Sequence, residues 1–84
     1  MNRPQPIVVE SDATGRPRAV TLRAGRPGAR RLRVLRIEDT WQIEEGWWQE
    51  RPVSRRYWRL ALADGRTATV FQDLLEGTWW RQNY

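Results

Sequence analysis

The sequence predicts a small all-β protein: an antiparallel meander of five or six strands that forms a bent sheet or an SH3-like barrel. The length of 84 residues leaves room for only one core. Apolar and polar residues alternate in several short runs, which is the period of half-buried strands. Turn-forming Gly, Pro and Asp residues separate these runs. We expect residues 1–6 to be a flexible lead-in and residues 7–84 to form a single β domain.

The first strands are short and separated by turn signals. Residues 7–9 are Ile-Val-Val, a β-prone run, and residues 11–17 contain Asp, Gly and Pro. Apolar residues then alternate with Thr and Arg over residues 20–24. A Gly-Arg-Pro-Gly turn at 25–28 makes a loose hairpin of residues 18–36.

The next apolar residues change phase partway along the strand. Leu32 and Val34 fall on one face of an extended strand, whereas Leu35 and Ile37 fall on the other. Such a change predicts a β-bulge near Val34 and Leu35. A short helix over part of residues 35–45 is the alternative, although the β-branched and aromatic content favours a strand.

The clearest local signal is a hairpin. Residues 57–63 and 66–72 flank Asp64-Gly65, which predicts a two-residue type I′ turn. Residues 78–84 then form the last strand. The expected cross-strand partners are Leu62 with Thr67, Leu60 with Thr69, Trp58 with Phe71, and Arg56 with Asp73.

Charge is unevenly distributed along the chain. All 15 basic residues are Arg, and the net charge is +5. Residues 1–36 hold nine Arg against two acids, whereas residues 37–84 hold six Arg against eight acids. The basic front half indicates a polyanionic or acidic partner. A GC-rich genome, which favours Arg codons, is the alternative explanation for the use of Arg alone.

The composition argues against a catalytic function. The chain has no His, Cys or Lys, so the commonest general base, nucleophiles and Schiff-base residue are missing, and no disulfide can form. Ser11 and Ser54 have no activating base nearby in sequence. Four acidic residues lack the spacing of metal ligands and indicate a solvated loop. They are Glu38, Asp39, Glu44 and Glu45. We therefore expect no enzyme, no cofactor and no metal.

Targeting signals are also lacking. The first residues contain no apolar signal-peptide region, and no apolar run approaches the length of a membrane span. We expect a cytoplasmic protein with no membrane partner.

A basic cluster is the first candidate binding feature. It comprises Arg30, Arg31, Arg33 and Arg36, with Arg23 beside it. Arg31 and Arg33 share one strand face, and no acidic residue lies between Gly15 and Ile37. Such a stripe can contact phosphates. A solvated face without a ligand is the alternative.

The six Trp residues are the second feature. We expect Trp41 and Trp58 to belong to the core. Neighbours in a strand point to opposite faces, so one of Trp79 and Trp80 should point away from the core. An outward Trp can cover a second small core, stack on an Arg, or hold a base or peptide.

The back half of the chain carries a recurring pattern of Trp, Arg and turn residues. It runs Ile37-Glu38-Asp39-Thr40-Trp41, Trp47-Trp48, Ser54-Arg55-Arg56-Tyr57-Trp58, Asp64-Gly65-Arg66, Phe71-Gln72-Asp73-Leu74 and Gly77-Thr78-Trp79-Trp80. This pattern resembles the small C-terminal domain of ImuB-type proteins, the inactive Y-family-polymerase-like subunits of bacterial translesion mutagenesis. It also resembles short stand-alone proteins of unassigned function in bacteria with such systems.

The resemblance covers residues 37–84, and residues 6–36 fit only the stand-alone form. Gln72 departs from it, because Arg is common at this place in the family. The resemblance implies no catalytic residues, a setting in DNA-damage tolerance, and contacts with DNA or with a polymerase or recombinase partner.

These observations lead to a functional hypothesis. We expect a non-catalytic accessory module of DNA repair or translesion synthesis that binds nucleic acid, such as single-stranded DNA, or a replication partner. The expected contacts are Arg23, Arg30, Arg31, Arg33, Arg36, Trp79 and Trp80. The alternative is an SH3-like protein-interaction adaptor without a nucleic-acid role.

Overall fold

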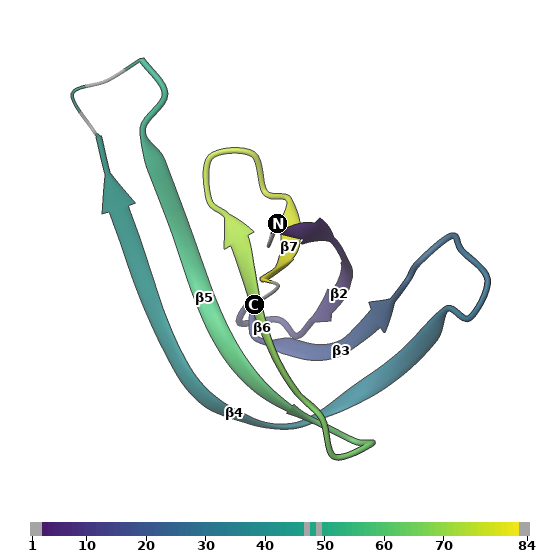
Figure 1. Ribbon diagram of the computed structural model, residues 1–84. Coiled ribbons are helices and arrows are strands. Elements are labelled where there is room, and N and C mark those ends of the chain that lie inside the picture. The colour runs from purple at the N-terminus through teal and green to yellow at the C-terminus, as the bar shows by residue number, and fades with distance from the viewer. Residues whose placement is uncertain (1–2, 47, 49, 83–84) are drawn as a thin grey trace.

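The computed structural model describes residues 3–46, 48 and 50–82, and this part of the chain is built from strands and turns. Seven antiparallel strands form one sheet in the order β1-β7-β6-β5-β4-β3-β2 (Figure 1). Their bounds are β1 Gln5–Pro6, β2 Val8–Ser11, β3 Pro17–Leu22, β4 Arg30–Glu45, β5 Val53–Leu62, β6 Thr67–Asp73 and β7 Trp79–Gln82. The all-β prediction is confirmed. Nowhere in the described part is there a helix with the length and apolarity that crossing a membrane requires.

The sheet is curled, so that its two edge strands come from one short segment of the chain, residues 5–11. Strands β1 and β2 stand at opposite ends of the strand order, yet only Ile7 separates them in sequence. The Ile7 amide also donates to the Trp79 carbonyl at 3.4 Å. The expected lead-in therefore contributes a strand, because Gln5 and Pro6 pair with β7. Residues 1–2 and 83–84, which belong to the expected lead-in and last strand, lie outside the described residues.

The core fills the inner face of this curl. Trp58 is only 5% exposed, which confirms its predicted core position, and its ring lies 5.0 Å from that of Trp79. The buried cluster comprises Ile7, Val20, Leu22, Leu32, Trp58, Leu60, Leu62, Ala68 and Val70. Partly buried residues that pack against it are Val9, Val34, Ile37 and Trp79.

Strand β4 is 16 residues long, and two bulges let it bend around the core. Its register with β5 shifts between Val34 and Arg36, which confirms the predicted bulge, and shifts again between Ile37 and Asp39. The helical alternative for this segment is wrong, since all of it is strand. The first part of β4 pairs with β3 and the rest with β5. In Figure 1, β4 and β5 rise together as a hairpin beyond the rest of the sheet.

The β5–β6 turn differs from the predicted type. The Gly65 amide donates to the Leu62 carbonyl at 3.0 Å, and the Leu62 amide donates to the Arg66 carbonyl at 2.8 Å. Gly65 has φ +87°, whereas Asp64 is not among the residues with positive φ. This is a three-residue loop, a type I turn followed by a left-handed glycine, and not a two-residue type I′ turn.

The extra loop residue moves the register by one position. Tyr57, and not Trp58, lies opposite Phe71, while Trp58 lies opposite Val70. The expected Arg56–Asp73 pair is also wrong, because Arg56 lies opposite Gln72 and Arg55 lies opposite Asp73. The Arg56 guanidinium instead donates to the Gln42 side-chain oxygen at 2.8 Å.

Candidate nucleic-acid interface

A line of aromatic residues crosses the outer face of the sheet. Trp41 on β4 lies opposite Tyr57 on β5, which lies opposite Phe71 on β6. Phe71 in turn lies opposite Trp80 on β7. Residues directly opposite one another project from the same face, so these four form one row across four strands. We call it the outer aromatic row.

The row has a covered centre and accessible ends. The rings of Trp41 and Tyr57 stack with centroids 5.3 Å apart, and those of Tyr57 and Phe71 are tilted at 4.9 Å. Tyr57 is 8% exposed and Phe71 2%, whereas Trp41 and Trp80 are both half-buried. The prediction that Trp41 is a core residue is wrong, because its ring lies on the outer face at the end of the row.

Two arginines of β5 lie against this row. The Arg55 guanidinium lies 4.6 Å from the Phe71 ring centroid, and that of Arg59 lies 5.7 Å from the Trp41 ring. Both are two residues from Tyr57, so the strand period places all three on the outer face. Cation–π attraction holds a positive charge close to the rings. Sequence reasoning missed this arrangement, because it needs the correct β4–β5–β6 register.

The predicted Arg cluster is largely neutralised. Arg31 Nε donates to Glu10 Oε2 at 2.6 Å, and its Nη2 donates to Oε1 at 3.0 Å. This bidentate hydrogen bonding lowers the pKa of the Glu10 carboxyl and raises the pKa of Arg31. Arg36 contacts Glu38 at 3.3 Å, and Arg30 lies 4.0 Å from Asp64.

Arg33 is the exception in this cluster. No carboxylate within the described ranges lies in ion-pair distance of it. It lines a shallow hollow of about 360 Å³ whose other charged lining residues are Asp12, Arg16, Arg18 and Arg36. The remaining basic candidate, Arg23, lies in the β3–β4 loop and lines a different pocket, with Arg26 and Arg81.

The two predicted Trp contacts lie on opposite faces of β7. Trp79 packs against the core and Trp58, so it is not presented to a ligand on the outer face. Trp80 belongs to the outer aromatic row, and its indole N–H donates to the Thr78 hydroxyl at 3.1 Å. Of the expected contact residues, only Trp80 joins this row. Trp47, which is part of the family resemblance, lies outside the described residues.

The acidic residues form hydrogen bonds and ion pairs at the surface. Glu38 contacts Arg36, and the Glu44 carboxylate accepts a hydrogen bond from Gln42 at 2.7 Å. In the part of the chain that is described, no three carboxylates gather as a metal site would require.

The fold and this face together define a small curled β domain with an Arg-flanked aromatic row on its outer surface. Comparison of the chain with protein-family models, with curated proteins and with solved structures gave no significant match.

Proposed function

We propose that this protein is a non-catalytic module that binds single-stranded nucleic acid through the outer aromatic row. The observation that carries the proposal is the alignment of Trp41, Tyr57, Phe71 and Trp80 across four neighbouring strands, with two arginines against the rings. Aromatic platforms of this kind bind unpaired bases by stacking, and adjacent positive charge attracts the phosphates.

The two ends of the row supply separate base contacts. Neighbouring strands lie about 4.8 Å apart, so three spacings place the ends roughly 14 Å from each other. One base cannot reach both Trp41 and Trp80 at that separation. The buried Tyr57 and Phe71 rings hold the platform in place, and Arg55 and Arg59 offer phosphate contacts above it.

The biological setting we propose is DNA repair or translesion synthesis. The resemblance over residues 37–84 to the C-terminal domain of ImuB-type proteins supports this setting. Trp41, Tyr57, Phe71 and Trp80 all belong to that segment, as do both flanking arginines. In that setting, the module would deliver or retain single-stranded DNA for a polymerase or recombinase partner.

Titration of a fluorescently labelled oligothymidylate tests the binding surface. Trp41→Ala and Trp80→Ala should each weaken binding roughly 5- to 160-fold, because stacking contributes about 1–3 kcal/mol per base. Trp48→Ala is the matched control, since Trp48 is 69% exposed but lies outside the row. Circular dichroism checks that each variant keeps the β fold.

The salt dependence tests the arginines. Replacing Arg55 and Arg59 by Gln should make the plot of log K against log salt less steep, by about 0.7 for each phosphate that an arginine no longer neutralises. If the unaltered protein shows no binding at about 50 mM salt, where even non-specific contacts hold well, the nucleic-acid proposal is wrong.

Exposed apolar residues favour a protein partner as the second candidate function. Trp48 is 69% and Leu75 60% exposed, and both lie in connections between strands. Leu74 is also exposed, and its amide donates to the Ser54 carbonyl at 2.9 Å, which ties the β6–β7 turn to the start of β5. If the oligonucleotide does not bind, these residues are the docking surface expected for an SH3-like adaptor.

A further inference from the structure

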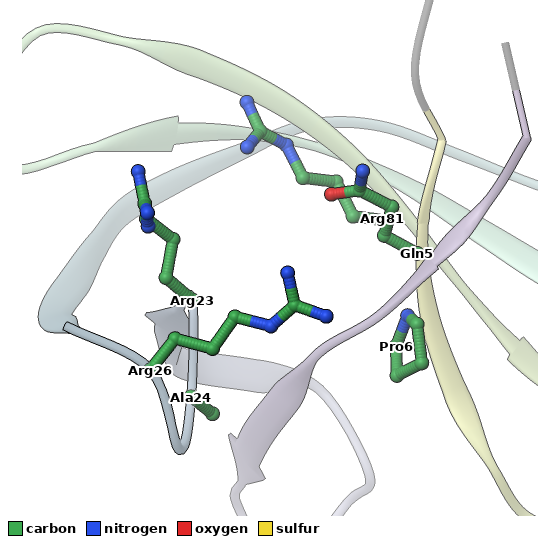
Figure 2. A pocket seen from close by; sticks show the side chains of 6 residues that line it. All are labelled: Gln5, Pro6, Arg23, Ala24, Arg26 and Arg81. Carbon is green, nitrogen blue, oxygen red and sulfur yellow. The ribbon is translucent and has the colours of Figure 1, made fainter. Parts of the chain in front are cut away.

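Two arginines of the β3–β4 loop and one from the distant strand β7 line a single pocket at the end of the curled sheet. Figure 2 shows the side chains of Arg23, Arg26 and Arg81 extending toward a shared space. The pocket has a volume of about 630 Å³. Its lining residues are Gln5, Pro6, Arg23, Ala24, Arg26 and Arg81. They come from β1, β7 and the β3–β4 loop.

The charges in this pocket have no counterions within the described chain. Arg30, Arg31 and Arg36 each lie within 4.0 Å of a carboxylate. No such partner is present for Arg23, Arg26 or Arg81 among the residues that the structure describes. Within the described residues, ion pairs thus neutralise three of the nine front-half arginines, whereas the three arginines of this pocket lie together without a carboxylate and would attract an external anion.

The backbone places these side chains by specific local structure. Arg23 has φ +54° and is the only described residue other than glycine with a positive φ. A left-handed conformation is unfavourable for Arg, and such strain concentrates at ligand sites. The Arg26 amide donates to the Arg23 carbonyl at 3.0 Å, which closes the turn that carries both side chains.

Strand β7 separates this pocket from the outer aromatic row. Arg81 lies opposite Gln5 and Trp80 lies opposite Pro6. Because Trp80 and Arg81 are neighbours in a strand, their side chains project from opposite faces of the sheet. Arg81 enters the pocket from the sheet, whereas Arg23 and Arg26 enter it from the loop.

We propose that this pocket binds a terminal phosphate or a pyrophosphate group. Planar guanidinium groups hold phosphate oxygens through paired N–H donors, and three of them suit the several negative charges of such a group. The Gln5 amide supplies a neutral donor at the same site. Nucleotides and the phosphorylated ends of nucleic-acid strands both carry a group of this kind.

Binding of inorganic pyrophosphate tests the pocket without involving base stacking. By isothermal titration calorimetry, the triple variant R23Q/R26Q/R81Q should bind pyrophosphate at least 10-fold more weakly than the unaltered protein. The control R16Q/R18Q/R33Q removes the same charge elsewhere and should lose much less affinity. Arg26→Gln alone should weaken pyrophosphate binding several-fold. Because Arg26 lies in an exposed loop, this single variant tests the pocket even if the triple variant fails to fold.

The outcomes separate this site from the outer aromatic row. Equal affinity in the two triple variants, or no pyrophosphate binding at low salt, would overturn the proposal. Trp41→Ala, on the distant strand β4, should leave pyrophosphate affinity unchanged, so failure of the row does not imply failure of the pocket. A nucleoside triphosphate and a 5′-phosphorylated oligonucleotide, each compared with its unphosphorylated form, then identify the source of the phosphate.

Discussion

At Gly65 the backbone has φ +87°, a value that side chains with a Cβ atom rarely adopt. An added Cβ would meet no atom within 4 Å, so the demand for glycine is conformational and not steric. The same loop geometry recurs at Gly15, whose amide donates to the Asp12 carbonyl at 3.0 Å. Single glycines therefore determine where the neighbouring strands reverse direction.

Substitution of Gly65 tests this requirement. Gly65→Ala should lower the free energy of unfolding by about 1 kcal/mol, because a left-handed conformation costs an L-residue about that much. Gly65→Asn should cost less, since Asn tolerates this region better. Urea denaturation measures both, and an unchanged midpoint for the Ala variant would contradict the left-handed assignment.

Aspartates complete these turns. The Asp12 carboxylate accepts hydrogen bonds from the Thr14 hydroxyl and amide and from the Arg16 amide, which lower its pKa. Asp64 and Asp73 accept backbone amides of their own turns in the same way, at 3.0 and 2.9 Å. Such side-chain bonds favour turns over continued strands.

At the scale of elements, the β4–β5–β6 unit gives its two faces different roles. The inner face buries Trp58 and Leu60 in the core, while the outer face carries Trp41 and Tyr57. Both faces hold large aromatic residues, so period-2 alternation alone cannot tell which face is inside. Sequence reasoning therefore placed both Trp41 and Trp58 in the core, and it was right only for Trp58.

Alanine substitutions distinguish the two faces. Trp58→Ala should lower the free energy of unfolding by roughly 3–5 kcal/mol, which is most of the stability expected for a domain this small. Trp41→Ala should cost about 1–2 kcal/mol, because it removes one stacked pair and leaves the core intact. Equal destabilisation by the two substitutions in chemical denaturation would contradict the assignment of Trp41 to the outer face.

At the scale of the whole molecule, residues 5–11 join the two edges of the sheet. Strand β1 pairs with β7 and β2 pairs with β3, while Ile7 between them enters the core. This one segment therefore supplies the edge strand at each end of the sheet, and both edge strands are short. Residues 5–11 are thus part of the architecture and not an appendage to it.

Closure of the sheet can be tested at two neighbouring residues. Ile7→Ala should lower the free energy of unfolding by about 2–5 kcal/mol, since it leaves a cavity where the edges meet. Val8→Ala should change it by no more than about 0.5 kcal/mol, because Val8 is 50% exposed. Similar urea midpoints for the two variants would contradict a closing role for Ile7.

Local sequence signals were sufficient to predict the class of fold. Alternating apolar residues predicted strands, turn residues predicted reversals, and the phase change at Val34 and Leu35 predicted a bulge. These features depend on neighbouring residues, whose side-chain periods and backbone preferences act over a few positions. The same signals gave the β5–β6 hairpin but misjudged its loop by one residue.

Tertiary structure decided the register and the charge pairing. One more residue in the β5–β6 loop aligned Tyr57 with Phe71, and so created the outer aromatic row. Glu10 neutralises Arg31 from 21 positions away, because β2 and β4 both flank β3. Closure of the sheet likewise brought Arg81 to the β3–β4 loop. Each of these depends on contacts between distant segments, which local patterns of hydrophobicity and charge do not encode.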